Sequence, residues 1–331
     1  MPQRRFDVLG IGNAIVDMLA KASDDFVNAE NIHKGVMTLI DESRAAELFG
    51  KMPPPIIASG GSAANTMAGL AGLGGHAAYI GRVHDDHWGG LFSHDMKAIG
   101  VHYETKPAVM GLPTACCLIF ITPDGQRSMN TFLGASTELS TDDLEEDLIR
   151  DSAVTYLEGY LFDKDPAQEA FVLAARLAHK YGNKVALTLS DPFCVNRHRA
   201  AFQKLVSAGV DILFANEAEV CALYEKNSVE EVLPLLAGAC ELAIITRSEE
   251  GSLILNKRKQ VKITAEKVVR VVDSTGAGDL YAAGFLFGYT RGMDLQKCGL
   301  IGSVCAAEVI SHVGPRPQAD LKKLIESKGI L

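Results

Sequence analysis

The chain has little clustered positive charge, no long apolar run and no secretion signal. Its 331 residues carry a formal net charge of −9, and its longest basic cluster is Lys257-Arg258-Lys259, which argues against a nucleic-acid-binding surface. No stretch approaches the length of a membrane span, and residues 1–6 lack the apolar segment of a signal peptide. We therefore expect a cytoplasmic protein that binds small molecules, with neither nucleic acid nor membrane as a partner.

Paired metal-binding or disulfide motifs are also missing. The seven cysteines are odd in number and form no Cys-x-x-Cys pair, so neither a disulfide framework nor a thiolate metal site is indicated. Among the histidines, only His84-Asp85-Asp86-His87, with His94 nearby, resembles a metal cluster. Its spacing fits no closed zinc pattern, and a solvated polar turn is the better interpretation.

Two common nucleotide-binding patterns are absent or incomplete. No Gly-x-x-x-x-Gly-Lys followed by Ser or Thr occurs, so the chain has no P-loop. Gly10-Ile11-Gly12-Asn13-Ala14-Ile15 begins like a dinucleotide fingerprint, but Ile15 stands where the third glycine is needed for close helix packing. This removes the main support for an NAD-dependent dehydrogenase.

What the sequence does contain is a regular alternation of strand-like and helix-like stretches, which is typical of a parallel sheet covered on both faces. We predict strands over residues 6–11, 77–80, 154–157, 184–189, 212–215 and 242–246, and helices that include 166–181 and 229–238. With 47% hydrophobic residues the chain can bury a large core. No repeat or long linker divides it, so we expect a single domain over residues 1–331.

Two further segments interrupt this alternation. Residues 35–40 and 114–133 are predicted to be β-structure, the second as two strands around the turn Pro123-Asp124-Gly125-Gln126. Inserted strands cannot bury both faces, so they should form a small sheet that projects over an edge of the main sheet. We expect a lid built from segments near 13–45 and 101–135.

The most informative motif is Asp273-Ser274-Thr275-Gly276-Ala277-Gly278-Asp279, between a strand-like run at 268–272 and a helix-like run at 280–289. A strand-to-helix turn of small residues presents backbone N–H groups at the positive end of the helix dipole, which is an anion hole. Asp279 can take a proton from an attacking hydroxyl beside it. Alone, the motif does not exclude an ordinary turn with Asp279 as a first-turn acid.

A second glycine-rich stretch, Gly60-Gly61-Ser62-Ala63-Ala64-Asn65, also leads into a predicted helix. Asn65 offers a donor and an acceptor to a ligand hydroxyl, whereas close helix packing better explains the later Gly69 and Gly72. After the first strand, Asn13 and Asp17 flank an apolar segment. An aspartate there can accept hydrogen bonds from a sugar diol, or it can be a turn or cap residue.

Carboxylates also follow the predicted strand at 212–215, in Asn216-Glu217-Ala218-Glu219. Ligands of open α/β sheets collect at the carboxyl ends of strands. Glu219 can hold Mg²⁺ through water, because Mg²⁺ retains several waters and takes few protein ligands. A helix cap is the alternative interpretation.

In combination, these motifs resemble the ribokinase or PfkB family of ATP-dependent carbohydrate and nucleoside kinases. Gly60 to Asn65 is similar to the first family signature, Asn216 to Glu219 to its Asn-x-x-Glu motif, and Asp273 to Asp279 to the second signature, in the family's order. The resemblance covers essentially the whole chain. It implies a ribokinase-like three-layer α/β sandwich with a mainly parallel sheet and a small inserted β-sheet lid, and it implies ATP and Mg²⁺ as cofactors.

The resemblance also implies roles for the matched positions. Asp279 would be the catalytic base, and Arg127 in the lid would reach the phosphates upon closure. The other implied residues are Gly276, Ala277 and Gly278 for the transferred phosphoryl group; Asn13, Asp17, Gly60, Gly61 and Asn65 for sugar hydroxyls; Asn216, Thr246, Ser248, Gly251 and Thr275 for ATP; Glu219 for Mg²⁺; and Asp273, with Thr275 and the loop near Gly314, for a monovalent cation such as K⁺.

Three segments resemble the adenosine kinase branch more than ribokinases or fructokinases: residues 12–17, 127–135 and 313–317. An adenine ring needs apolar cover on both faces. The apolar residues in segments that the family places around the acceptor are Met37, Leu39, Leu133, Tyr160 and Leu161. Packing of the lid hinge is the alternative role for these residues.

The expected reaction is therefore phosphorylation of a nucleoside 5′-hydroxyl, with adenosine as the first candidate and a sugar such as ribose or fructose as the second. A regulator that binds a nucleoside or sugar without catalysis is a further alternative, and the intact Asp279 and anion-hole turn count against it. Family members occur as monomers and as dimers joined through the lid, so both a monomer and a lid-mediated homodimer remain open.

Overall fold

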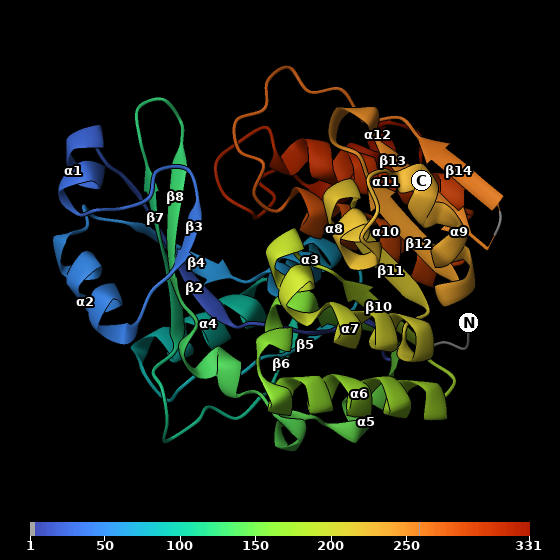
Figure 1. The fold of residues 1–331 in the computed structure, drawn as a ribbon, viewed down its shortest axis with the longest axis horizontal. Helices are drawn as coiled ribbons and strands as arrows, with labels where there is room; N and C mark the ends of the chain where they lie inside the picture. Colours follow the sequence, from blue (N-terminus) through green and yellow to red (C-terminus); the bar gives the residue numbers. More distant parts are fainter. Residues whose placement is uncertain (1–3, 258) are drawn as a thin grey trace.

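The computed structural model describes residues 4–257 and 259–331, and nine of its strands form one large sheet (Figure 1). The strands lie in the order β14-β13-β12-β11-β10-β9-β1-β5-β6. All neighbours are parallel except β13, which is antiparallel to both β12 and β14. Their bounds are β1 (Phe6–Ile11), β5 (Ala77–Ile80), β6 (His102–Tyr103), β9 (Ser152–Glu158), β10 (Lys184–Thr188), β11 (Ile212–Asn216), β12 (Leu242–Thr246), β13 (Ser252–Asn256) and β14 (Lys259–Ile263).

Helices cover both faces of this sheet, which gives three layers (Figure 1). Successive strand residues point to opposite faces, so Val8 and Tyr156 join one buried cluster while Leu9 and Leu157 join the other. The first cluster packs under α3 (Ser62–Gly72), α4 (His87–Ala98), α10 (Ala277–Thr290), α11 (Leu295–Val309) and α12 (Leu321–Ser327). The second packs under α5 (Glu146–Arg150), α6 (Asp165–Lys180), α7 (Pro192–Gly209), α8 (Glu217–Tyr224) and α9 (Val229–Ala239). The predicted three-layer α/β fold is confirmed.

The second sheet has five strands in the order β3-β8-β7-β2-β4 and stands beside the main sheet (Figure 1). Its strands are β2 (Ile15–Lys21), β3 (Met37–Leu39), β4 (Ile56–Gly60), β7 (Ala115–Ile121) and β8 (Arg127–Phe132). Helices α1 (Asp24–Ala29) and α2 (Glu42–Lys51) cover its outer face, where Val27 and Leu48 pack in one cluster with Met18.

The bounds expected for the lid need correction. Strand β4 lies outside both predicted segments, yet it completes the lid by pairing antiparallel with β2, with Ile15 opposite Gly60. Strand β6 lies inside the second segment but pairs with β5 of the main sheet, with Tyr103 opposite Tyr79. Both errors concern short strands whose assignment depends on a distant pairing partner rather than on their own residues.

The strand predicted at 268–272 is also incorrect. This segment is an extended loop without a neighbouring strand, and Val269 and Val271 are exposed. The Val272 N–H donates to the Ile310 carbonyl (2.8 Å), which ties the loop to the end of α11. A run of β-branched residues forms a strand only where a partner offers backbone groups to pair with.

The His84 to His87 motif forms the entry to α4. Asp86 caps that helix by accepting a hydrogen bond from the Gly89 N–H (2.8 Å), and it also accepts from the Thr114 N–H (2.9 Å) just before lid strand β7.

Across residues 4–257 and 259–331, no group of three His, Cys, Asp or Glu side chains is arranged to hold a metal ion. Within the same ranges, no helix combines the length and apolar character needed to cross a membrane. The short 3₁₀ helices are η1 (Gly134–Glu138), η2 (Thr141–Asp143), η3 (Gly159–Asp163) and η4 (Ser248–Glu250).

Candidate active site

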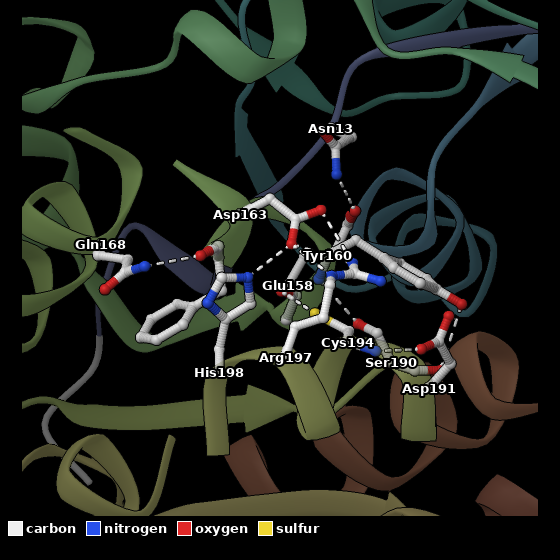
Figure 2. A network of polar contacts seen from close by, with 12 residues as sticks. Asn13, Glu158, Tyr160, Asp163, Gln168, Ser190, Asp191, Cys194, Arg197 and His198 are labelled. Atoms are coloured by element: carbon white, nitrogen blue, oxygen red, sulfur yellow. Dashed lines mark hydrogen bonds and ion pairs between the residues drawn. The ribbon is translucent and has the colours of Figure 1, made fainter. Parts of the chain in front are cut away.

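The strand order reverses at β1 and β9. Open α/β sheets bind ligands in the crevice that such a reversal forms at the carboxyl ends of the strands. Asn13, just after β1, donates from Nδ2 to Oε1 of Glu158, the last residue of β9 (2.7 Å; Figure 2). The other oxygen of Glu158 accepts the Ala63 N–H at the start of α3 (2.8 Å). Burial raises the pKa of Glu158 to about 7, although these two hydrogen bonds oppose the shift. A buried carboxylate thus joins the end of β1 to the start of α3.

The turn before α3 brings a second carboxylate into this crevice. Gly61 has φ of +97°, which favours glycine, and a Cβ atom at Gly60 would collide with the carboxylate of Asp17 on β2. The two glycines therefore allow the lid strand to approach the turn closely. Burial raises the pKa of Asp17 to about 6, against the opposing charges of Arg316 and Arg127.

Asp279 lies where the first turns of α3 and α10 meet. Its Oδ1 accepts from Ser62 Oγ (2.6 Å) and its Oδ2 from Asn65 Nδ2 (3.0 Å). The helices approach closely because Gly69 lacks a side chain: a Cβ there would lie 2.6 Å from Leu280 Cδ1. Burial raises the pKa of Asp279 to about 6, and the bonds to Ser62 and Asn65 and the charge of Arg316 oppose this. Asn65 Oδ1 is buried without a hydrogen-bond partner in the described structure, so it can accept from a ligand hydroxyl.

The turn from Asp273 to Asp279 has the form expected of an anion hole. Gly276 begins α10 in the left-handed region (φ +80°, ψ −1°), and no side chain caps this helix end. The N–H groups of the first helical turn lack intrahelical carbonyl partners. Gly278 is exposed, and a Cβ there would meet no atom within 4 Å. The Ala277 N–H donates to the Ser274 carbonyl (3.3 Å) and closes the turn, which leaves the amides of Gly276 and Gly278 open to a phosphate.

Arg127 brings a guanidinium from lid strand β8 to this turn. Its Nη1 forms an ion pair with Asp273 and donates to Thr275 Oγ1 (2.6 Å). Its Nε and Nη2 are buried and have no partner in the described structure. These unused donors beside an uncapped helix end fit the phosphate chain of ATP, whose negative charge would satisfy them.

A monovalent cation at Asp273 does not fit this arrangement. Asp273 Oδ1 accepts the Thr275 N–H (3.0 Å), while Oδ2 accepts the Gly314 N–H (2.8 Å) and pairs with Arg127. Burial raises the pKa of Asp273, but Arg127 and the two amides outweigh this effect and lower the pKa below its usual value. The guanidinium thus takes the place expected for K⁺, and we derive no role for that ion.

The residues expected to bind ATP gather at the ends of the next strands. Asn216 and Thr246 are direct neighbours across β11 and β12. Ser248 is exposed with a left-handed φ of +49°, and Gly251 (φ +87°) packs directly on the backbone of residues 263–265. The glycine at 251 therefore serves a close backbone approach.

Glu219 adopts the alternative arrangement, a helix cap. Its Oε1 accepts from Asn216 Nδ2 (2.7 Å) and its Oε2 from the Asn216 N–H (2.9 Å), while Asn216 Oδ1 accepts the Glu219 N–H (2.9 Å). Burial raises the pKa of Glu219 to about 7. Both oxygens are already hydrogen-bonded, so they fit a Mg²⁺ held through water better than one bound directly. The magnesium role stays a prediction.

Apolar residues expected at the acceptor pocket divide into two groups. Leu39, Thr131, Cys117 and Asp17 are successive neighbours across β3, β8, β7 and β2, so they share one face of the lid sheet, opposite α1 and α2. Leu39 and, two residues earlier, Met37 are 51% and 43% exposed on this inner face. The lid therefore presents apolar side chains on the same face as the Asp17 carboxylate, three strands away from it.

The other expected pocket residues lie outside the lid sheet. Leu161 is 3% exposed in the hydrophobic cluster beneath α6 and α7, so its expected pocket role is corrected to core packing. Tyr160, half-buried, donates from its backbone N–H to Ser190 Oγ (3.2 Å) and from its hydroxyl to the Ser190 carbonyl (3.3 Å; Figure 2). Leu133 is half-buried at the start of η1.

Sequence reasoning missed three residues of the candidate site. Glu158 was detectable, because an acid follows the predicted strand at 154–157 directly, where α/β sheets bind ligands. Ser62 lies inside a recognised motif, but nothing local indicated a bond to Asp279. Arg316 lies in the segment 313–317 that resembles the adenosine kinase branch, but nothing in the sequence indicated its partners Ser59 and Ala64, which lie more than 250 residues away in the chain.

Known proteins share this architecture. A family model described as pfkB family carbohydrate kinase matches residues 51–321. The chain belongs to the PfkB family. It is therefore a kinase, and the resemblance inferred from the three ordered motifs is confirmed.

Individual relatives of this PfkB kinase carry different substrate names. The solved adenosine kinase from Sinorhizobium meliloti is 50% identical, with 98% of this chain and 99% of that chain covered and a TM-score of 0.91. A probable sugar kinase from Rhizobium etli is 48% identical, with 99% and 100% covered and a TM-score of 0.93. A 5-dehydro-2-deoxygluconokinase from Clostridium perfringens is 26% identical over 93% of this chain and 88% of its own length.

Proposed function

We propose that this PfkB kinase transfers the γ-phosphoryl group of ATP, with Mg²⁺, to the 5′-hydroxyl of adenosine and so forms AMP. The observation that carries the proposal is the position of Asp279, which faces the uncapped amides of α10 on one side and the Asn65 and Asp17 crevice on the other. The adenosine kinase from Sinorhizobium meliloti, 50% identical over nearly the whole chain, supports adenosine as the acceptor.

Asp279 has the properties of a general base for this reaction. With a pKa raised to about 6, it is ionised at neutral pH yet more basic than an ordinary aspartate. Ser62 and Asn65 fix both of its oxygens, so the carboxylate holds one orientation towards the acceptor. It would receive the hydroxyl proton as the new O–P bond forms.

The remaining residues would bind and orient the two substrates. The α10 amides and Arg127 would hold the oxygens of the transferred group, whose charge they offset. ATP supplies the phosphoryl group and Mg²⁺ neutralises phosphate charge when bound, with Glu219 and Asn216 placed to hold the hydrated ion. Asn65 and Asp17 would bind the ribose hydroxyls, while the inner lid face around Met37 and Leu39 would cover adenine.

A sugar kinase of the same family is the second candidate. Asn13 and Glu158 add a buried polar pair at the crevice, and such groups suit an acceptor with several hydroxyls. The relatives named as a probable sugar kinase and a 5-dehydro-2-deoxygluconokinase agree with this alternative. The exposed apolar residues Met37 and Leu39 on the inner lid face favour the nucleoside.

A substrate panel separates the candidates. ADP release would be measured with adenosine, other nucleosides, ribose, fructose and 5-dehydro-2-deoxygluconate, each with Mg²⁺ and ATP. We expect the highest kcat/KM with adenosine. Turnover of one sugar while adenosine remains inert would reject the nucleoside proposal, and binding of adenosine without any turnover would favour the regulator.

A further inference from the structure

A C-terminal loop at residues 312–317 connects the two halves of the site. The Gly314 N–H donates to Asp273 Oδ2 (2.8 Å). Pro315 packs on the anion-hole turn so closely that a Cβ at Gly276 would lie 2.9 Å from its Cα atom. Arg316 extends from the same loop to the acceptor half. One short segment thus touches both the phosphate side and the acceptor side of Asp279.

Arg316 binds the acceptor half through oxygen atoms of the protein backbone and one hydroxyl. Its Nη2 donates to the Ser59 carbonyl (3.0 Å) and to Ser59 Oγ (2.8 Å), and its Nη1 donates to the Ala64 carbonyl (3.0 Å). Ser59 belongs to lid strand β4, and Ala64 precedes Asn65 in α3. The guanidinium therefore joins the lid to the helix that orients Asp279.

The charge of Arg316 acts on a crowded group of acids. Asp17 and Asp279 both have a pKa raised by burial, and Arg316 opposes the shift in both groups. Asp95 of α4, which accepts from the Ser59 N–H (2.9 Å), is a further acid close to the guanidinium. Four other titratable groups interact electrostatically with Asp279: Glu158, Glu219, Tyr156 and Tyr160. None of them carries a positive charge, so none can offset the charge of the Asp279 carboxylate.

We propose that Arg316 is a positioning residue for phosphoryl transfer: it fixes Ser59 and Ala64 by hydrogen bonds and holds a positive charge beside the carboxylates of Asp279 and Asp17. This inference rests on the proposed role of Asp279 as the base. Because the oxygen atoms that bind Arg316 are uncharged, its positive charge acts on Asp95, Asp17 and Asp279 together.

The two parts of this role can be separated with two substitutions. Arg316→Gln removes the charge and keeps a planar donor for the Ser59 carbonyl, whereas Arg316→Lys keeps the charge and loses the forked geometry. In Arg316→Gln the acidic limb of the kcat/KM profile should move upward by about one pH unit. Without the positive charge of Arg316, the Asp279 carboxyl ionises only at a higher pH. In Arg316→Lys the limb should stay at its wild-type pH while turnover falls about tenfold.

The experiment measures kcat/KM for adenosine between pH 5 and pH 9 in the full chain, with melting temperatures of each variant. Arg291→Gln is the matched control, because Arg291 caps the far end of α10 and pairs with Asp7 at the surface. It should lose some stability and keep the wild-type limb. Arg316→Gln with an unmoved limb would overturn the proposal, even if its melting temperature fell.

The remaining outcomes also support or overturn the proposed role of Arg316. If Arg316→Gln does not yield folded protein, Arg316→Lys decides alone: a wild-type limb with slower turnover supports the proposal, and a displaced limb overturns it. Asp279→Asn separates this inference from the proposed function. Full activity of Asp279→Asn would reject Asp279 as the base, and the inference would fall with it. If Asp279→Asn loses activity but Arg316→Gln keeps the wild-type acidic limb, only the inference is rejected.

Discussion

Replacement of Gly276 by alanine tests whether the anion-hole turn is built by backbone conformation. Gly276 has φ of +80°, where an L side chain costs about 1–2 kcal/mol. The added Cβ would also lie 2.9 Å from Pro315 Cα and 3.0 Å from the Pro315 carbonyl oxygen. Pro315 is a rigid ring in the loop that carries Arg316, so the turn itself must shift.

A displaced turn would misplace the amides that hold the transferred phosphoryl group. Loss of one such donor costs about 10²–10³ in kcat. We therefore expect Gly276→Ala to lower kcat by about 100-fold and to lower the free energy of unfolding by more than the roughly 1–2 kcal/mol that backbone strain alone costs. Steady-state kinetics with adenosine and ATP measure the first quantity, and urea unfolding followed by circular dichroism measures the second.

The matched control is Gly292→Ala, just beyond the other end of the same helix. Gly292 has φ of +70°, but a Cβ there would meet no atom within 4 Å. It should therefore lose about 1–2 kcal/mol of stability through backbone strain alone and keep the wild-type kcat. Equal kcat values for the two variants would refute the argument that the Gly276 turn positions the phosphoryl group.

Three further predictions follow from the site. The kcat/KM should rise with pH through about 6 and level off above it, because Asp279, with a pKa raised to about 6, must be ionised to act; a profile that falls over this range would contradict the assignment. Arg127→Met should lower kcat at least about 100-fold while calorimetry shows nearly unchanged adenosine binding, and a loss confined to adenosine affinity would be inconsistent with a phosphate contact. Glu158→Gln, which cannot accept from both Asn13 and the Ala63 amide, should raise the KM for adenosine about tenfold with a small change in kcat; an unchanged KM would exclude a role in acceptor binding.

The sequence predicted six of the nine strands of the main sheet and the small-residue turn before α10, because both depend on neighbouring residues. Alternating apolar runs mark buried strands, and a turn that places Gly276 at φ of +80° favours glycine through its own backbone conformation. The bonds of Asp279 to Ser62 and Asn65 were beyond reach, since they depend on how α3 packs against α10 more than 200 residues later.

The failures have the same physical origin. Strand β4 exists because β2 pairs with it, and the loop at 268–272 has β-branched residues but no partner. Arg316 acts through Ser59 and Ala64, which only the folded chain brings near. Leu161 follows Tyr160 directly, yet it faces the core, because the 3₁₀ turn η3 directs successive side chains to different sides.

The most direct test of the central claim is product analysis with wild-type protein and Asp279→Asn. Phosphorus NMR of a reaction containing adenosine, ATP and Mg²⁺ should show AMP and ADP forming together with the wild type. Asp279→Asn should reduce this rate by about 10²–10⁴-fold while adenosine binding, measured by calorimetry, changes little. AMP formation at the wild-type rate by Asp279→Asn would contradict the account.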